Sequence, residues 1–485
     1  MTDPKNMSQG ITRNLTNYGD PGFAAYLRRS FARSMGYSLD SLSRPIIGIA
    51  TSPSGFNNCH RSMPDLVEAV KRGVLKRGGL PIDFPTISLG EVFLSPTSMM
   101  FRNLMSMDVE EMIRAQPIDV VVLLGGCDKT LPAMIMGAIS AGKPYVVLPA
   151  GPMITNKFEN ERLGACTDCR RYWSKFRSGE VSKEKIKLVE NKLSSSSGTC
   201  GVMGTASTMA CIVEAMGLCL TDASSVPAVF SERLKLSEET GVVAARIAKG
   251  TIKKIKKVTE ADIHNGLVTL LGLGGSTNAL IHLTAIAGRL GVQIDLKKFN
   301  QISEKVPVLV NLKPSGTNYM EDFYYAGGIL SLMFSLAEKL NLEEITVSGL
   351  RLKEIISQKE TINNLDIKLN QQYHSVFDIT KGIEQPQWLL GSKLNIVDSC
   401  FQNDNDATAV IYQKEGGSLQ RVSQNELEIL VNKVANGLRK LGINKGDRIA
   451  IDMPMTLEAV AIYLAAIKAG NPVATIADSF TPNEI

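Results

Sequence analysis

The chain has 485 residues, enough for roughly two or three domains of ordinary size. Hydrophobic residues make up 44% of it and charged residues 21%, so a large core can form and global disorder is excluded. The net charge of +5 is mild for this length, and no nucleic-acid-binding module is evident. No run of about 18 apolar residues occurs, and we therefore expect no membrane span.

The cysteines indicate the type of chemistry. Residues 1–5 lack the pattern of a secretory signal peptide. Eight cysteines in a long chain without such a signal are more typical of thiols and metal ligands than of a disulfide framework. The composition therefore predicts a cytoplasmic enzyme.

Short apolar runs alternate with helical stretches over the first half of the chain. The runs that predict strands are residues 45–50, 118–124 and 144–148. The stretches that predict helices are residues 63–77, 109–115, 131–140 and 207–218. This alternation predicts an α/β domain with a mainly parallel sheet.

Residues 125–130, Gly-Gly-Cys-Asp-Lys-Thr, form the most informative segment. They follow a buried strand, at the carboxyl edge where open α/β sheets bind their ligands. The thiol of Cys127 suits iron or zinc, whereas the carboxylate of Asp128 suits magnesium. The alternative is a buried core cysteine beside the start of a helix.

Cys59 and Cys200 lie in similar settings, after small or polar turn residues that can present a thiolate. The three cysteines are too far apart in the sequence for a zinc finger or a ferredoxin-type run. They can meet only if the fold brings three loops together. Cys166 and Cys169 form a C-x-x-C motif, which is typical of a redox pair or half of a zinc site, but no second half is present.

Six motifs in one order resemble the dihydroxy-acid and phosphogluconate dehydratase family over about residues 20–355. The version at residues 166–173 is most similar to the sugar-acid dehydratases. The motifs lie at residues 84–91, 107–115, 125–130, 163–173, 274–279 and 320–322. The resemblance implies a parallel-sheet dehydratase domain over residues 1–355.

The resemblance also implies the cofactors. Three thiolates, Cys59, Cys127 and Cys200, would hold a [2Fe-2S] cluster. A Mg²⁺ ion would be bound by Glu91, Asp128 and a carbamylated Lys129, which also makes Lys129 a catalytic residue. The alternative for the two carboxylates is a solvated position at a helix start. The implied enzyme is a homo-oligomeric hydro-lyase that converts a 2,3-dihydroxy acid or sugar acid, a small-molecule substrate, to a 2-keto acid.

From about residue 363 the chain resembles the acyl-adenylate-forming superfamily, which includes the acyl-CoA synthetases. The motifs are residues 388–396, 434–449 and 454–470. The second of them predicts a helix, a glycine-bounded turn and a strand. Residues 356–485 are therefore expected to form a partial α/β adenylate-forming N-terminal subdomain.

The junction leaves three hypotheses. The dehydratase resemblance stops before that family's C-terminal domain, so the general base is unassigned, and Ser479 is given no role. The second resemblance ends before a phosphate-binding loop. We favour the hydro-lyase over a catalytically inactive fusion or truncated product, and over an acyl-CoA synthetase-type ligase.

Overall fold

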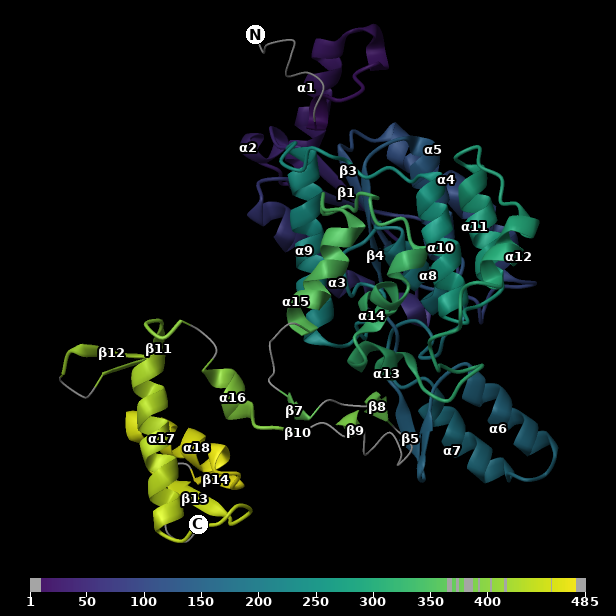
Figure 1. Ribbon diagram of the computed structural model, residues 1–485. Coiled ribbons are helices and arrows are strands. Elements are labelled where there is room, and N and C mark those ends of the chain that lie inside the picture. Colours follow the sequence, from purple (N-terminus) through teal and green to yellow (C-terminus); the bar gives the residue numbers. More distant parts are fainter. Residues whose placement is uncertain are drawn as a thin grey trace. The chain divides into compact units, whose positions relative to one another are not determined.

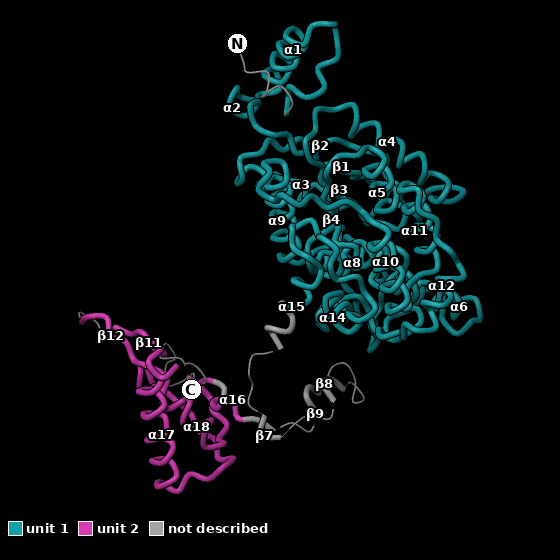
Figure 2. The backbone as a smooth tube through the Cα atoms, turned by 45° about the horizontal axis from the view of Figure 1, so that its top comes forward, with its two compact units in different colours: residues 1–359 teal, residues 360–485 magenta. Residues whose placement is uncertain are grey.

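The structure is a computed structural model of an α/β protein that divides into two compact units, residues 1–359 and 360–485 (Figure 2). The residues that it describes are 10–363, 369–371, 375–378, 387–390, 393–401, 404–413, 417–454 and 456–476. Ser479 lies outside them.

The first unit contains a central sheet, a small hairpin and many helices (Figure 1). Its strands are β1 (Ile46–Thr51), β2 (Leu80–Pro85), β3 (Val120–Gly125), β4 (Tyr145–Pro149), β5 (Asn156–Phe158) and β6 (Glu161–Leu163). Its α-helices are α1 (Pro21–Ser34), α2 (Leu39–Leu42), α3 (Met63–Lys76), α4 (Arg102–Ala115), α5 (Thr130–Ala141), α6 (Thr167–Arg177), α7 (Lys183–Leu193), α8 (Thr205–Ala215), α9 (Ser231–Ala248), α10 (Glu260–Gly272), α11 (Asn278–Gly288), α12 (Leu296–Ser303), α13 (Met320–Tyr325), α14 (Gly328–Ser335) and α15 (Leu352–Asn363).

The central sheet is parallel and has the order β2-β1-β3-β4. Strand β3 is buried along its whole length because helices cover both faces. Val120 and Val122 belong to one buried cluster, with side chains of α3 and α9. Val121 and Leu123 belong to another, with side chains of α4, α5, α8 and α11. The alternation gives three layers, with the sheet in the middle.

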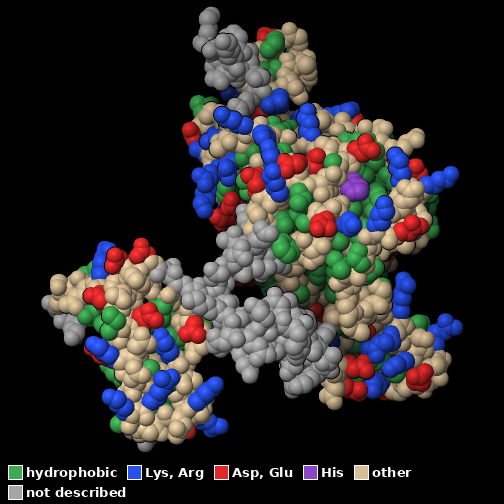
Figure 3. All heavy atoms as spheres, viewed as in Figure 1, with side chains coloured by type: hydrophobic (Ala, Val, Ile, Leu, Met, Phe, Trp, Pro, Cys, Tyr) green, Lys and Arg blue, Asp and Glu red, His purple; other side chains and the backbone are tan. Residues whose placement is uncertain are grey.

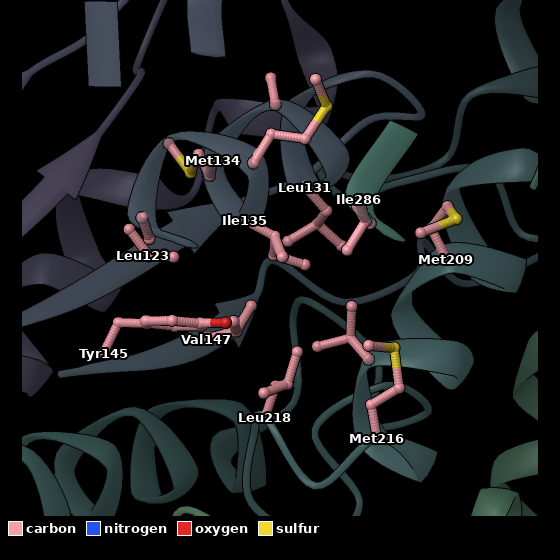
Figure 4. Close-up of a cluster of buried hydrophobic side chains, with 14 of the residues drawn as sticks. Leu123, Leu131, Met134, Ile135, Tyr145, Val147, Met209, Met216, Leu218 and Ile286 are labelled. Atoms are coloured by element: carbon pink, nitrogen blue, oxygen red, sulfur yellow. The ribbon is translucent and has the colours of Figure 1, made fainter. Parts of the chain in front are cut away.

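Figure 4 shows part of the second cluster. Leu123 and Val147 of the sheet belong to it and are both fully buried. Met134 and Ile135 of α5 and Met209 of α8 are also fully buried there. Burial of each such side chain contributes about 1.5–3 kcal/mol, so this face of the sheet is a main source of stability for the unit.

The structure confirms the three strands predicted from the sequence, as β1, β3 and β4. Strand β2 was missed, since Pro81, Asp83 and Pro85 are poor strand formers. It is an edge strand, where proline is tolerated. Helix α4 begins earlier than predicted, and α8 ends at Ala215, before Gly217 with its φ of +69°.

The second unit contains short strand pairs and three α-helices among the residues described. Helices α17 and α18 form its buried core with Val397. Its helices are α16 (Ile396–Cys400), α17 (Gln424–Lys440) and α18 (Leu457–Lys468). Its strands are β7 (Leu369–Gln371), β8 (Ser375–Asp378), β9 (Gln387–Leu390), β10 (Lys393–Leu394), β11 (Thr408–Gln413), β12 (Leu419–Ser423), β13 (Ile449–Asp452) and β14 (Val473–Ile476).

The predicted helix, glycine turn and strand of the second unit are confirmed. Helix α17 starts with a capping box between Ser423 and Glu426 and is followed by Gly442, whose φ is +86°. Strand β13 comes next and pairs in parallel with β14.

Basic and acidic side chains are interspersed on the face of the first unit that Figure 3 shows, in keeping with the mild net charge. Among the residues described, none of the helices is both long enough and apolar enough to span a membrane.

Helices α3 and α9 approach each other through glycines. A Cβ atom added to Gly73 would lie 1.9 Å from the carbonyl oxygen of Glu238, and one added to Gly241 would lie 2.2 Å from that of Val70. Backbone atoms cannot move aside as a flexible side chain can, so this contact requires glycine on both helices.

We expect Gly73→Ala to lower the free energy of unfolding of the first unit by about 3 kcal/mol or more, since the added methyl group forces the two helices apart. Denaturant unfolding followed by circular dichroism measures this. The matched control is Gly288→Ala at the end of α11 in the same unit, where nothing lies within 4 Å of the added atom. There we expect a gain of up to about 1 kcal/mol from the higher helix propensity of alanine. Equal effects at the two sites would contradict the close approach.

Candidate active site at the carboxyl edge of the sheet

The strand order creates a switch point between β1 and β3. From β1 the chain passes through α3 to the edge strand β2, whereas from β3 it passes through α5 to β4 on the opposite side. Helices α3 and α5 cover opposite faces of the sheet. The carboxyl ends of β1 and β3 therefore flank the crevice where α/β sheets of this kind bind ligands.

The predicted site residues follow these strand ends. Cys59 lies in the turn after β1, Glu91 in the segment after β2, and Cys127, Asp128 and Lys129 directly after β3. Cys200 joins them through a bridge that lies just beyond β4: Thr199 pairs with Pro152. The amide of Thr199 donates to the carbonyl of Gly151 at 2.9 Å, and the Thr199 carbonyl accepts from the amide of Met153 at 2.8 Å.

Gly126 allows the turns after β1 and β3 to touch. A Cβ atom at Gly126 would lie 3.0 Å from the carbonyl oxygen of Cys59 and 3.1 Å from Cδ2 of His60. The His60 ring is fully buried, its Nδ1 donates to the carbonyl of Ser52 at 2.8 Å, and its Nε2 lies 3.4 Å from Oγ1 of Thr130. Burial lowers the pKa of His60. A neutral histidine thus holds the Cys59 turn against the start of α5.

Three thiols meet at this point. A hydrogen bond with Cys127, burial, and the nearby Cys127 and Cys200 thiols all raise the pKa of Cys59. Cys127 has a left-handed backbone, with φ of 59°, and its Sγ donates to Oδ1 of Asp128 at 3.4 Å. The structure therefore brings Cys59, Cys127 and Cys200 together from separate loops.

Beside the thiols, Lys129 joins two carboxylates. Its Nζ donates to Oδ2 of Asp128 at 2.5 Å and to Oε2 of Glu91 at 3.0 Å, and its side chain is only 6% exposed. Burial by itself lowers the pKa of Lys129, but the hydrogen bonds and charges of Asp128 and Glu91 outweigh it and raise the pKa. Glu91 also accepts a hydrogen bond from Ser98. The unmodified lysine is thus an ammonium ion between two anions.

A fourth thiol lies at the edge of this group. The Sγ of Cys166 is 3.0 Å from that of Cys200, and Cys166 is exposed. The hydrogen bond with Cys200 outweighs burial and lowers the pKa of Cys166 to about 7. The first cysteine of the C-x-x-C motif therefore lies near the site. Cys211 and Cys219 are buried in the core.

His282 of α11 is a fully buried neighbour of Lys129. Its Nδ1 accepts a hydrogen bond from Arg102 at 2.9 Å. Burial and the positive charges of Arg102 and Lys129 lower the pKa of His282 to about 4, so the ring is neutral. The role of Arg102 was missed, since nothing in its own sequence neighbourhood singles it out.

The donors are suited to two kinds of metal. Among the residues described, no three His, Cys, Asp or Glu side chains surround a single point as the ligands of one ion would. The thiolate ligands of a cluster each bind one of its irons, so they need not all point at one centre. Three thiols suit iron, and two carboxylates suit magnesium. The donor set therefore fits an iron–sulfur cluster next to a Mg²⁺ ion.

Comparison with known proteins assigns the family. The family described as dihydroxy-acid/6-phosphogluconate dehydratase N-terminal matches residues 44–355. The chain belongs to this dehydratase family. A second family, described as AMP-binding enzyme, matches residues 397–485.

The similar curated proteins are dehydratases. The 6-deoxy-6-sulfo-D-gluconate dehydratase of Pseudomonas putida is 40% identical over 302 residues, which cover 62% of this chain and 52% of that protein. The L-arabonate dehydratase of Azospirillum brasilense is 41% identical over 70% of this chain and 60% of its own length. The dihydroxy-acid dehydratase of Thermodesulfovibrio yellowstonii is 32% identical over 80% and 74%. The chain thus spans little more than half the length of the first two dehydratases.

The contact at Gly126 gives a prediction for the candidate site. We expect Gly126→Ala to push the Cys59 turn away, to cost about 1 kcal/mol of stability, and to speed alkylation of Cys59 in the metal-free chain. Peptide mapping after timed alkylation measures the rate. The control is Gly55→Ala in the same turn, where nothing lies within 4 Å of an added Cβ. An unchanged rate in Gly126→Ala would mean that this contact does not hold Cys59.

Proposed function

We propose that the first unit is a hydro-lyase that dehydrates a 2,3-dihydroxy sugar acid to a 2-keto acid. Cys59, Cys127 and Cys200 would hold a [2Fe-2S] cluster, and Glu91, Asp128 and a carbamylated Lys129 would hold Mg²⁺. The observation that supports the proposal is the proximity of three thiols to a carboxylate pair at the switch point of the sheet.

The two groups would supply Lewis acidity. An iron that lacks one protein ligand would assist the departing hydroxyl, and Mg²⁺ would stabilise the negative charge that develops on the substrate. The chain's own residues position these ligands. His60 fixes the Cys59 turn, and neutral His282 adds no further positive charge beside Lys129. Carbamylation would replace the Lys129 ammonium with an anionic oxygen ligand between Glu91 and Asp128.

The substrate class rests on the similar proteins. Two of the three dehydratases above are named for sugar acids, and the third for dihydroxy acids. We propose a small aldonate as substrate and a homo-oligomer as the working form.

The test is anaerobic purification, quantitation of iron and sulfide, and a keto-acid assay over a panel of aldonates and short dihydroxy acids with Mg²⁺. Keto-acid formation by iron-loaded protein would support the proposal. Iron-loaded protein that turns over none of these acids would favour the inactive fusion product.

The match of residues 397–485 to AMP-binding enzymes favours one further assay. ATP–pyrophosphate exchange with a panel of short acids would support a ligase. We expect no exchange, and exchange without keto-acid formation would overturn the hydro-lyase proposal.

A further inference from the structure

Cys166 lies beside Cys200 although the two are 34 residues apart in the sequence, and their sulfur atoms are separated by 3.0 Å. The main chains that carry them are also joined, because the amide of Gly201 donates to the carbonyl of Ala165 at 3.1 Å. The two thiols are therefore close because their backbone segments are hydrogen-bonded to each other and because their side chains point toward each other.

Both sides of this pair are anchored. On the Cys200 side, Thr199 is bridged to Pro152, and Oγ of Ser207 donates to the carbonyl of Cys200 at 3.3 Å. On the Cys166 side, the fully buried Asp168 accepts from the amide of Gly164 at 2.9 Å and from the hydroxyl of Tyr319 at 2.7 Å. Cys166 itself occupies the position before the first residue of α6.

We propose that Cys166 and Cys200 are a thiol pair that closes to a disulfide when no cluster is bound, and that the disulfide withdraws Cys200 from cluster assembly. The second half of this proposal rests on the proposed function, whereas bond formation does not. A disulfide bond is about 2.05 Å long, so the sulfurs need to approach by only about 1 Å.

The oxidant would be a low-molecular-weight disulfide. The thiolate of exposed Cys166 attacks one sulfur of that molecule, its S–S bond breaks, and one small thiol leaves. The Cys200 thiolate then attacks the Cys166 sulfur of the mixed disulfide and releases the second small thiol. Two protein thiols are oxidised, the small disulfide is reduced to two thiols, and the two protons pass to the leaving thiolates.

Accessibility favours this pair over the competing ones. Cys59 and Cys127 are also adjacent, but Cys127 is buried and Cys59 is only partly exposed. Cys169 is near Cys166 in sequence, yet it lies within α6, and the sulfur that contacts Cys166 is that of Cys200. Among the cysteines near the site, Cys166 is the one that a soluble reagent reaches first, and Cys200 is the nearest thiol to complete the exchange.

The experiment treats the full-length chain, stripped of metal by anaerobic chelation, with oxidised glutathione and maps its peptides by mass spectrometry. The expected product has lost two hydrogen atoms and links the peptides of Cys166 and Cys200. The link should persist in Cys169→Ser and be absent in Cys166→Ser. A main product that links Cys59 to Cys127 or Cys166 to Cys169, or a stable glutathione adduct on Cys166 without a link, would overturn the proposal.

Iron loading tests the consequence separately. We expect the oxidised chain to take up at least tenfold less iron than the reduced chain, with recovery after dithiothreitol, and Cys166→Ser to load equally well before and after treatment. Equal loading of the linked and reduced chains would overturn the withdrawal of Cys200. If the chain forms the link on oxidation but binds no iron when it is reduced, the proposed function is refuted, whereas the disulfide is still supported.

Discussion

Replacing Cys127 with serine is expected to abolish the iron–sulfur absorption of the anaerobically purified chain, with at least a roughly tenfold loss of bound iron and no keto-acid formation. Cys127 follows β3, one of the two strands that flank the switch point, and it contacts both Cys59 and Asp128. A serine hydroxyl is a harder and weaker iron ligand than a thiolate. Visible absorption and iron quantitation on the purified variant measure the effect.

The control for this variant is Cys400→Ser. Cys400 is an exposed cysteine of the second unit, and its Sγ lies 3.4 Å from the carbonyl oxygen of Ile396. We expect full iron content in Cys400→Ser. Wild-type iron content and absorption in Cys127→Ser would show that other thiols hold the iron.

The strands that flank the site were predictable because they are buried on both faces and read as unbroken apolar runs. The turn after β3 was also predictable, because two glycines end the apolar run. The sheet order was not predictable from those runs. The order includes β2, which its prolines make hard to recognise as a strand. This order places the ends of β1 and β3 side by side.

The grouping of the cysteines depended on tertiary contacts. Local sequence suggests that Cys166 pairs with Cys169, because a C-x-x-C motif offers no other partner nearby. The structure places it against Cys200, since the Thr199 segment is drawn to the end of β4 by the bridge with Pro152. Likewise, Arg102 and His282 meet only because α4 and α11 pack on the same face of the sheet.

The charge of Lys129 determines how the two neighbouring carboxylates are neutralised. As an ammonium ion it satisfies Glu91 and Asp128, so the pair has no electrostatic need for a divalent cation. As a carbamate it would be a third anion beside them, and the three groups together would require one. The unmodified lysine and the proposed Mg²⁺ site would therefore be alternative states of the same three side chains.

We accordingly expect Lys129→Arg to remove Mg²⁺ binding and to lower kcat by at least about a hundredfold. A guanidinium stays charged at any accessible pH and keeps pairing with the two carboxylates, but it is not available for carbamylation in the way an amine is. In the wild type, Mn²⁺ binding followed by electron paramagnetic resonance should strengthen when bicarbonate is added to CO₂-free buffer, and in Lys129→Arg it should not.

The matched control is Lys71→Arg in α3. Lys71 also joins two carboxylates, with its Nζ 2.9 Å from both Glu68 and Asp83. This variant should bind Mn²⁺ like the wild type, because only the lysine between Glu91 and Asp128 is expected to alternate between cation and metal ligand. Full Mg²⁺-dependent turnover in Lys129→Arg would exclude the carbamate and leave Lys129 as a structural counter-charge.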